Sequence, residues 1–102
     1  MNEGVKTSEE ALARLSVFKK TRQAEYNLIS LGIFGSFARG QADDESDVDV
    51  VFETRTPNLL RTSRMKRELE ALLARRVDVV RLRERMNPRL KERILREARY
   101  VQ

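Results

Sequence analysis

The sequence predicts an α/β (α+β) fold in which helices pack on one side of a small mixed β-sheet. Three observations support this prediction. A chain of 102 residues has room for a single domain, spanning residues 1–102. Segments with apolar residues at helical spacing alternate with short segments in which apolar and polar residues alternate one by one. Their order is helix, strand, turn, strand, helix, strand, helix, which is typical of a small layered domain.

The first part of the chain is expected to form a helix that leads into a strand. Thr7 is a suitable N-cap, and Glu10 completes a capping box, so we expect a helix from about Ser8 to Ala24. The segment from Asn27 to Phe34 is expected to be a strand, because apolar and small residues alternate along it. The apolar positions that share one face of this strand are Ile29, Leu31 and Ile33. The strand leads directly into a tight Gly-Ser turn.

After the Gly-Ser turn, the sequence predicts a short helical turn, a polar loop, two more strands and two more helices. The two helices start at good N-caps, Asn58 and Asn87, and the second cap is followed by a proline at the first helical position. Their apolar residues recur at helical spacing and mark the sides expected to be buried. The expected bounds are helical turn 36–39, loop 40–46, strand 47–53, helix 58–75, strand 76–80 and a closing helix from 88.

The composition excludes several classes of catalytic chemistry. The chain has no cysteine and no histidine, which rules out disulfides, thiolate or histidine metal sites, and Ser-His-Asp triads. Catalysis must therefore use carboxylates, hydroxyls, lysine or arginine, with or without a hard metal ion. No apolar run approaches the ~20 residues that span a bilayer, and the first residues lack the pattern of a signal peptide. We expect a cytoplasmic protein with no membrane partner.

Charge is distributed unevenly along the chain. Residues 1–54 carry 6 Lys and Arg against 10 Asp and Glu, whereas residues 55–102 carry 15 against 6. The basic half is either a set of solvated helix faces or a patch that meets a polyanion or an acidic partner. Charge alone leaves this choice open. Only six aromatic residues occur and no stacking platform for bases is visible, so we do not expect direct nucleic-acid binding.

Two acidic residues in an apolar strand require an explanation. Aspartate is depleted in strands, yet Asp47 and Asp49 flank a valine in the second predicted strand. Because strand side chains alternate, both carboxylates lie on the face opposite Val48, Val50 and Phe52, with their Cα atoms roughly 6.5–7 Å apart. Like charges at this spacing repel each other unless a cation lies between them. Mg²⁺ suits this position, because it binds a few carboxylates together with substrate phosphates.

The third predicted strand carries a further acidic residue. Asp78 is the one charged residue in the run Val77–Val80. A lone aspartate in a strand is ordinarily a solvent-facing residue of a one-sided sheet. If this strand lies beside the second one, however, it brings a third carboxylate to the same ions. The combination of an Asp-x-Asp strand with another strand aspartate favours a metal site made of Asp47, Asp49 and Asp78.

The Gly-Ser turn before these strands provides the other half of a phosphoryl-transfer site. Gly35 lets the backbone approach a ligand closely. Ser36 at a helix start can offer its hydroxyl and free backbone N–H groups to a phosphate, and Arg39 one turn later adds a positive charge. A Gly-Ser pair alone is common in turns. Its combination with the strand aspartates is what makes the pattern specific.

This combination resembles the nucleotidyltransferase superfamily of DNA polymerase beta. The pattern is Phe34-Gly35-Ser36, ten residues, then Asp47-Val48-Asp49-Val50, and later Asp78 in its own strand. The resemblance is closer still to the MNT-type minimal nucleotidyltransferases, and it covers about residues 26–102. The segments that carry this closer resemblance are residues 35–40, 46–51, 77–80 and 94–101.

The resemblance implies a polymerase beta-like fold and a role for each motif residue. The turn would hold the triphosphate of ATP, and the aspartates would bind two Mg²⁺ ions. The third carboxylate would also help to deprotonate the hydroxyl that attacks the α-phosphorus, with pyrophosphate as the leaving group. The implied residues are Gly35, Ser36 and Arg39 for nucleotide binding, and Asp47, Asp49 and Asp78 for catalysis and metal binding. A glycine often precedes the third-carboxylate strand in such proteins, whereas this chain has Ala74-Arg75-Arg76 there.

The resemblance also implies a partner. Stand-alone MNT proteins resemble the antitoxin half of toxin–antitoxin modules, in which the toxin is an all-helical HEPN-domain ribonuclease. In that family the antitoxin transfers AMP from ATP to a tyrosine of the toxin. We therefore expect a Mg²⁺-dependent protein adenylyltransferase antitoxin. A domain this short leaves little material for a separate acceptor-binding region, so we expect another protein to present the acceptor.

Two alternative functions remain open at this point. An antitoxin can neutralise its toxin by binding alone, with the basic half of the chain against an acidic toxin surface. Nucleotide transfer to a small molecule such as an aminoglycoside is the other alternative, although the extra domain that would form its pocket is lacking. The sequence does not determine the oligomeric state. Self-association as a homo-oligomer is compatible with a small domain that exposes sheet and helix surface.

Overall fold

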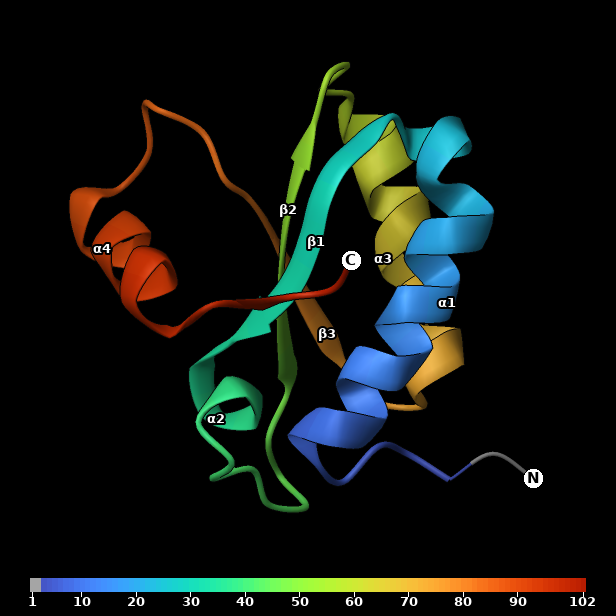
Figure 1. Ribbon diagram of the computed structural model, residues 1–102, viewed down its shortest axis with the longest axis vertical. Coiled ribbons are helices and arrows are strands. Elements are labelled where there is room, and N and C mark those ends of the chain that lie inside the picture. The colour runs from blue at the N-terminus through green and yellow to red at the C-terminus, as the bar shows by residue number, and fades with distance from the viewer. Residues whose placement is uncertain (1–2) are drawn as a thin grey trace.

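The fold is given by a computed structural model that describes residues 3–102. Within that range the chain forms four helices and four strands, and the long helices α1 and α3 lie side by side (Figure 1). None of these helices is both long enough and apolar enough to cross a membrane. The elements are α1 (Ser8–Tyr26), β1 (Leu28–Phe34), α2 (Gly35–Ala38), β2 (Val48–Thr54), α3 (Leu59–Leu73), β3 (Val77–Arg81), α4 (Pro88–Glu97) and β4 (Arg99–Tyr100).

The strands form one mixed sheet in the order β3-β2-β1-β4. Strand β1 pairs antiparallel with β2 and with β4, whereas β2 and β3 run parallel. The parallel pairing follows from the connection, because helix α3 carries the chain back to the end of the sheet where β2 begins. Two motif strands that lie far apart in the sequence are therefore neighbours in the sheet.

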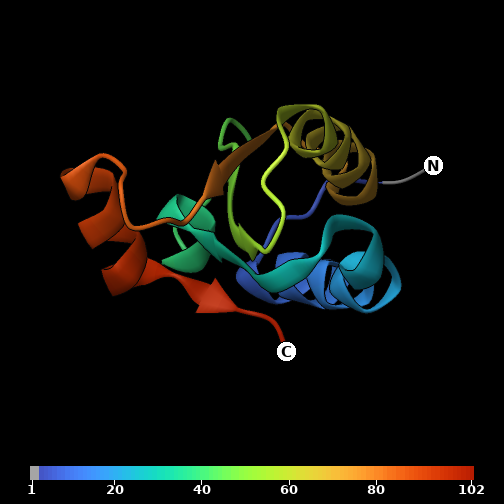
Figure 2. The same ribbon diagram turned by 90° about the horizontal axis from the view of Figure 1, so that it is seen from above.

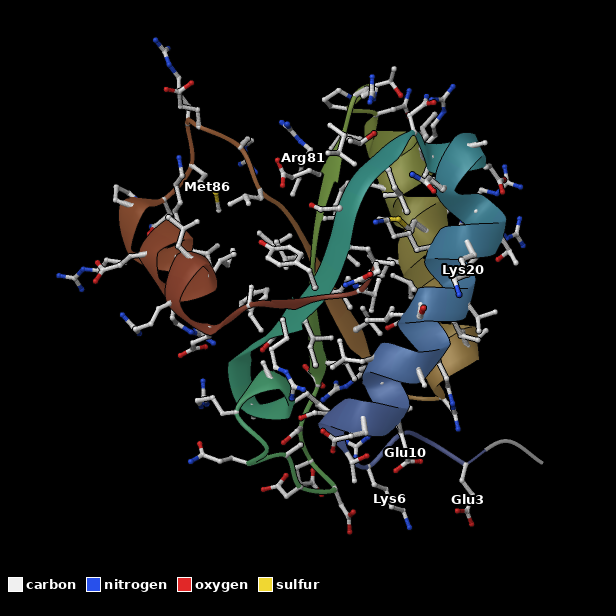
Figure 3. All side chains as sticks on the ribbon, viewed as in Figure 1. Glu3, Lys6, Glu10, Lys20, Arg81 and Met86 are labelled. Atoms are coloured by element: carbon white, nitrogen blue, oxygen red, sulfur yellow. The ribbon has the colours of Figure 1, made fainter. Side chains whose placement is uncertain are left out.

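The expected α+β fold with a mixed sheet is confirmed, and α1 and α3 cover one face as predicted (Figure 1). Helix α4 differs from the prediction, because it lies on the opposite face (Figures 1 and 2). That face carries an apolar patch on which Ile94 of α4 is buried against Phe34 and Val51. Met86, in the loop before α4, packs against the same patch (Figure 3). A sheet with apolar side chains on both faces needs cover on both.

The main hydrophobic core lies between the sheet and helices α1 and α3. One position departs from the predicted alternation along β1. Ile29 is 48% exposed, because a register shift between Leu28 and Ser30 places Leu28 in the core instead. The predicted shared face of Val48, Val50 and Phe52 on β2 is confirmed, because all three are buried in the main core.

The short strand β4 was not predicted. It consists of Arg99 and Tyr100, which pair with Ile33 and Gly32 of β1. Two residues show no detectable alternation, so the sequence pattern gives no sign of this strand. Gly32 permits the pairing, because a Cβ atom there would lie well under 3.0 Å from the carbonyl oxygen of Arg99. The strand ties the end of α4 to β1, close to the Gly-Ser turn.

The three predicted N-caps are confirmed. Thr7, Asn58 and Asn87 each accept a hydrogen bond from a backbone N–H in the first turn of their helix. Helix α3 ends at Leu73, two residues before the expected end, because Ala74 has a left-handed backbone with φ 54°. The left-handed conformation is more favourable for glycine than for alanine, because the Cβ atom of alanine is strained there. The chain nevertheless enters β3 in register with β2.

Ala74→Gly is expected to raise the free energy of unfolding by about 1 kcal/mol, because glycine adopts a positive φ without the Cβ penalty. Thermal and urea unfolding of the two proteins measure the difference. The matched control is Ala13→Gly, at an exposed position inside α1, where glycine lowers stability by about 1 kcal/mol. A loss of stability in both variants would contradict the left-handed assignment of Ala74.

Candidate active site

The sheet places the predicted carboxylates on one face. Asp49 in β2 and Asp78 in β3 are direct register partners, and paired strands lie ~4.8 Å apart. Asp47 precedes β2 by one residue and shares this face, because strand side chains alternate. It is the face opposite the main core, where α4 also lies. Strand β3 thus lies beside β2, which was the condition for Asp78 to join the other two aspartates.

The carboxylate of Asp47 is paired with an arginine at the entrance to β3. Arg76 Nε lies 3.3 Å from Asp47 Oδ1, and the Arg76 side chain is 83% exposed. An ion pair as exposed as this one contributes little to stability, so a ligand can displace it at small cost. Within residues 3–102 no three acidic side chains lie close enough together to hold a single metal ion. The register aligns Asp49 with Asp78, and the metal role of all three carboxylates stays a prediction.

Asp49 lies in surroundings that disfavour the charged form of its carboxyl group. Burial raises the pKa of its carboxyl group, and the negative charges of Asp78 and Asp47 raise that pKa further. The guanidinium groups of Arg93 and Arg39 act in the opposite direction without restoring the ordinary pKa. A divalent cation beside Asp49 would neutralise the repulsion, and carboxylate oxygens are the ligands that Mg²⁺ prefers. The charge and the ligand chemistry of these residues therefore suit the predicted ion, although the three carboxylates do not converge on one point.

The Gly-Ser turn lies directly against Asp49. Gly35 has a φ of 71°, and a Cβ atom at this position would lie well under 3.0 Å from a carboxylate oxygen of Asp49. Both the backbone angle and the close approach require glycine. Phe34, just before the turn, is the register partner of Asp49 across β1 and β2. The pairing of these two strands therefore holds the turn and the carboxylate together.

Helix α2 places the other two predicted nucleotide-binding residues beside this turn. Ser36 is its second residue and is partly buried. Arg39 follows the last turn of α2, and its Nη1 lies 3.1 Å from Glu97 Oε1. Phe37, between them, is fully buried in the main core and anchors the short helix. The structure thus brings the three residues predicted for nucleotide binding to one place, next to the aspartates.

Two residues of α4 at this turn were missed by the sequence analysis. Glu97 Oε1 accepts a hydrogen bond from the backbone N–H of Gly35 at 3.2 Å and lies 3.5 Å from Arg93 Nε. The Arg93 guanidinium lies over the Phe34 ring, 5.5 Å from its centroid. Burial by itself would raise the pKa of Glu97, but the Gly35 N–H and the nearby arginines hold that pKa below its ordinary value. The signal in the sequence was the i,i+4 spacing of Arg93 and Glu97. That spacing is common on helix surfaces, so it did not single out these two residues.

An open hollow adjoins the predicted metal site at the starting ends of β2 and β3. Its volume is about 440 Å³, and its walls carry both acidic and basic side chains, including Asp47, Arg75 and Arg76. Lys6, in the segment before α1, also lines it (Figure 3). The Gly-Ser turn does not line the hollow, which meets the predicted site through Asp47.

Comparison with known proteins shows the family of the chain. A family model described as a nucleotidyltransferase domain matches residues 15–101. The chain belongs to the nucleotidyltransferase domain family. This nucleotidyltransferase domain is 35% identical to the protein adenylyltransferase MntA of Thermococcus cleftensis over 96 residues, which cover 93% of this chain and 96% of MntA. The match spans nearly the full length of both proteins.

Solved structures share the fold of this nucleotidyltransferase domain. A minimal nucleotidyltransferase superimposes with a TM-score of 0.76 at 36% identity, covering 94% of this chain and 97% of the other. A chain from the complex of a tri-AMPylated Shewanella oneidensis HEPN toxin with an MNT antitoxin gives a TM-score of 0.64 at 18% identity, with coverages of 92% and 71%. The second comparison shows the fold alone. The predicted membership of the minimal nucleotidyltransferases is confirmed.

Proposed function

We propose that this nucleotidyltransferase domain is a Mg²⁺-dependent protein adenylyltransferase that modifies a tyrosine of a HEPN-domain toxin and so acts as its antitoxin. The observation that carries the proposal is the close approach of Gly35 to Asp49, whose register partner on the neighbouring strand is Asp78. A phosphate-binding turn and a carboxylate pair at one place are the two halves of a phosphoryl-transfer site. The family and the MntA relative support the same class of activity.

In the proposed reaction, the tyrosine oxygen attacks the α-phosphorus of ATP. A bond forms between these two atoms, the bond from the α-phosphorus to the bridging oxygen of the β-phosphate breaks, and pyrophosphate leaves with that electron pair. Asp78 is exposed on the edge strand β3, where it can accept the phenolic proton from an incoming tyrosine. Asp47, Asp49 and Asp78 would hold Mg²⁺, which would neutralise charge that develops on the phosphate oxygens.

The proposed acceptor is another protein. The solved complex of a tri-AMPylated HEPN toxin with an MNT antitoxin supports this choice, since a chain of that complex has the fold described above. The second half of the sequence carries 15 Lys and Arg against 6 Asp and Glu, a balance that would attract an acidic toxin surface. The exposure of Asp78 leaves its carboxylate within reach of such a surface.

Neutralisation by binding alone is the second candidate function. One observation favours it. Leu59 and Leu60 at the start of α3 are 87% and 83% exposed, and neighbouring exposed apolar side chains are typical of protein-binding surfaces. An antitoxin that only covers its toxin would need such a surface and would not need the carboxylates. The two functions therefore differ in their dependence on Asp47 and Asp49.

The test incubates the domain with Mg²⁺, the protein encoded next to it, and ATP radiolabelled on the α-phosphate. We expect label on the neighbouring protein, and we expect none with Asp47→Asn/Asp49→Asn or after the metal is removed with EDTA. ATP labelled on the γ-phosphate is the control, because AMP transfer leaves that phosphate in pyrophosphate. An unlabelled neighbour that still forms a stable complex with both versions would support neutralisation by binding alone.

A further inference from the structure

A cluster of donors converges on one carboxylate oxygen at the Gly-Ser turn. Glu97 Oε1 lies 3.2 Å from Gly35 N, 3.1 Å from Arg39 Nη1 and 3.5 Å from Arg93 Nε. The Glu97 side chain is only 13% exposed, whereas those of Arg39 and Arg93 are 41% and 43% exposed. The carboxylate therefore forms the inner part of the cluster, and the two arginines reach it from the solvent side.

This set of donors is the one that a phosphate oxygen would use. A free backbone N–H together with guanidinium groups binds phosphate oxygens through charge-assisted hydrogen bonds. A carboxylate oxygen has the same sign of charge and accepts the same hydrogen bonds. Glu97 thus occupies donors of Gly35 and Arg39 that the proposed function assigns to the triphosphate. Glu97 and a bound triphosphate cannot both use the Gly35 N–H.

Arg93 connects this cluster to the aspartates. Its Nη2 would lie 3.4 Å from a Cβ atom at Gly35, and the same glycine position lies against a carboxylate oxygen of Asp49. The stacking of Arg93 on the Phe34 ring fixes the direction of its guanidinium group. A triphosphate that runs from the Gly-Ser turn to the aspartates must therefore pass Arg93.

We propose that Arg93 is a further phosphate-binding residue, and that Glu97 is a resident carboxylate which the triphosphate of ATP displaces from the Gly35 N–H. The inference rests on the proposed function, because it takes ATP as the substrate of this site. Arg39 and Arg93 both face Oε1 of Glu97, and Arg96 Nη2 lies 4.0 Å from Oε2. The displaced carboxylate therefore leaves Arg39 and Arg93 free to pair with phosphate oxygens. Glu97 thereby limits the affinity for ATP, whereas Arg93 contributes to it.

A purely structural role for Glu97 predicts a different result. In that case its hydrogen bonds only hold α4 against the turn, and its loss would weaken ATP binding or leave it unchanged. Glu97→Gln separates the two roles, because glutamine keeps the shape and can still accept a hydrogen bond from Gly35 while it lacks the charge. Removal of a negative charge beside the triphosphate is expected to tighten ATP binding by roughly 3- to 10-fold.

The experiment measures the dissociation constant of a fluorescent ATP analogue in Mg²⁺ for the full chain. Arg93→Ala is expected to weaken binding by about 10-fold or more, and Arg93→Gln, which keeps most of the stem on Phe34, is expected to do the same. The matched controls on α4 are Arg89→Ala and Glu92→Gln, which make the same changes of charge at exposed positions. Both controls are expected to stay within about 2-fold of wild type.

The outcomes separate this inference from the proposed function. Unchanged affinity in both Arg93 variants, or weaker or equal affinity in Glu97→Gln, would overturn the inference even if AMP transfer to the toxin is normal. The Arg93 variants are expected to weaken ATP binding and Glu97→Gln to tighten it. If both shifts occur but the domain transfers no label from ATP to any protein, the inference is supported and the proposed transfer is overturned. A thermal melt of each variant in the absence of nucleotide separates loss of binding from loss of fold.

Discussion

Asp49→Asn is expected to abolish AMP transfer and, at the same time, to make the metal-free domain more stable. Asparagine keeps the size of aspartate but removes the charge that a divalent ion would bind, so the rate is expected to fall by about 10³-fold or more. Stability is expected to rise because Asp49 is a partly buried carboxylate next to Asp78. Its pKa is raised by burial first and by that neighbouring charge second, and the substitution removes both penalties.

The gain in stability has a defined dependence on pH. The carboxyl group of Asp49 has a higher pKa in the folded than in the unfolded chain, so the folded state binds its proton more tightly. The penalty on folding is absent below the unfolded pKa of about 4 and is fully present above the raised pKa. The difference in melting temperature between Asp49→Asn and wild type is therefore expected at pH 7 and should shrink as the pH falls toward about 4.

Transfer assays and thermal unfolding in EDTA measure these two effects on one set of proteins. Asp44→Asn is the control, because it makes the same change in the exposed loop before β2. It is expected to retain both the activity and the stability of wild type. Normal transfer by Asp49→Asn would contradict its assignment to the active site, and lower stability would contradict the unfavourable charge at this position.

Gly35→Ala is expected to abolish ATP binding and transfer and to lower the free energy of unfolding by about 2 kcal/mol. The backbone of Gly35 has a φ of 71°, which costs an L-residue roughly 1–2 kcal/mol. The added Cβ atom would also overlap a carboxylate oxygen of Asp49 and lie 3.4 Å from Arg93 Nη2. Either the turn or the aspartate must move, and the proposed phosphate and metal sites then separate.

Gly40→Ala provides the matched control for this substitution. Gly40 has the same φ of 71°, but a Cβ atom there would meet nothing within 4 Å. Its replacement is expected to cost only the backbone term of about 1–2 kcal/mol, with ATP binding and transfer retained. Equilibrium unfolding and the ATP titration distinguish the two variants. Equal losses of ATP affinity in both would show that backbone strain, and not the approach to Asp49, explains the need for glycine.

Local patterns were sufficient to predict most elements of the fold. The caps at Thr7, Asn58 and Asn87 and the alternation along β2 were all predicted in place. Each of these features depends on the backbone geometry of a few consecutive residues, so a short stretch of sequence contains it completely. The same reasoning failed where a local irregularity or a distant partner intervened. The register shift beside Ile29 separated this residue from the face that Leu31 and Ile33 share, and the two-residue strand β4 exists only because β1 is available to pair with it.

The sequence by itself determined that Asp47 and Asp49 share a face opposite the valines, that a Gly-Ser turn precedes them, and that a third strand carries Asp78. The tertiary structure alone decided which of these residues meet. It made Asp49 and Asp78 register partners, and it brought Glu97 to the Gly35 N–H across 62 positions of sequence. Such contacts depend on the order of strands and on the sheet face that each helix covers. That arrangement follows from burying the apolar faces of whole elements, and no spacing within one element encodes it.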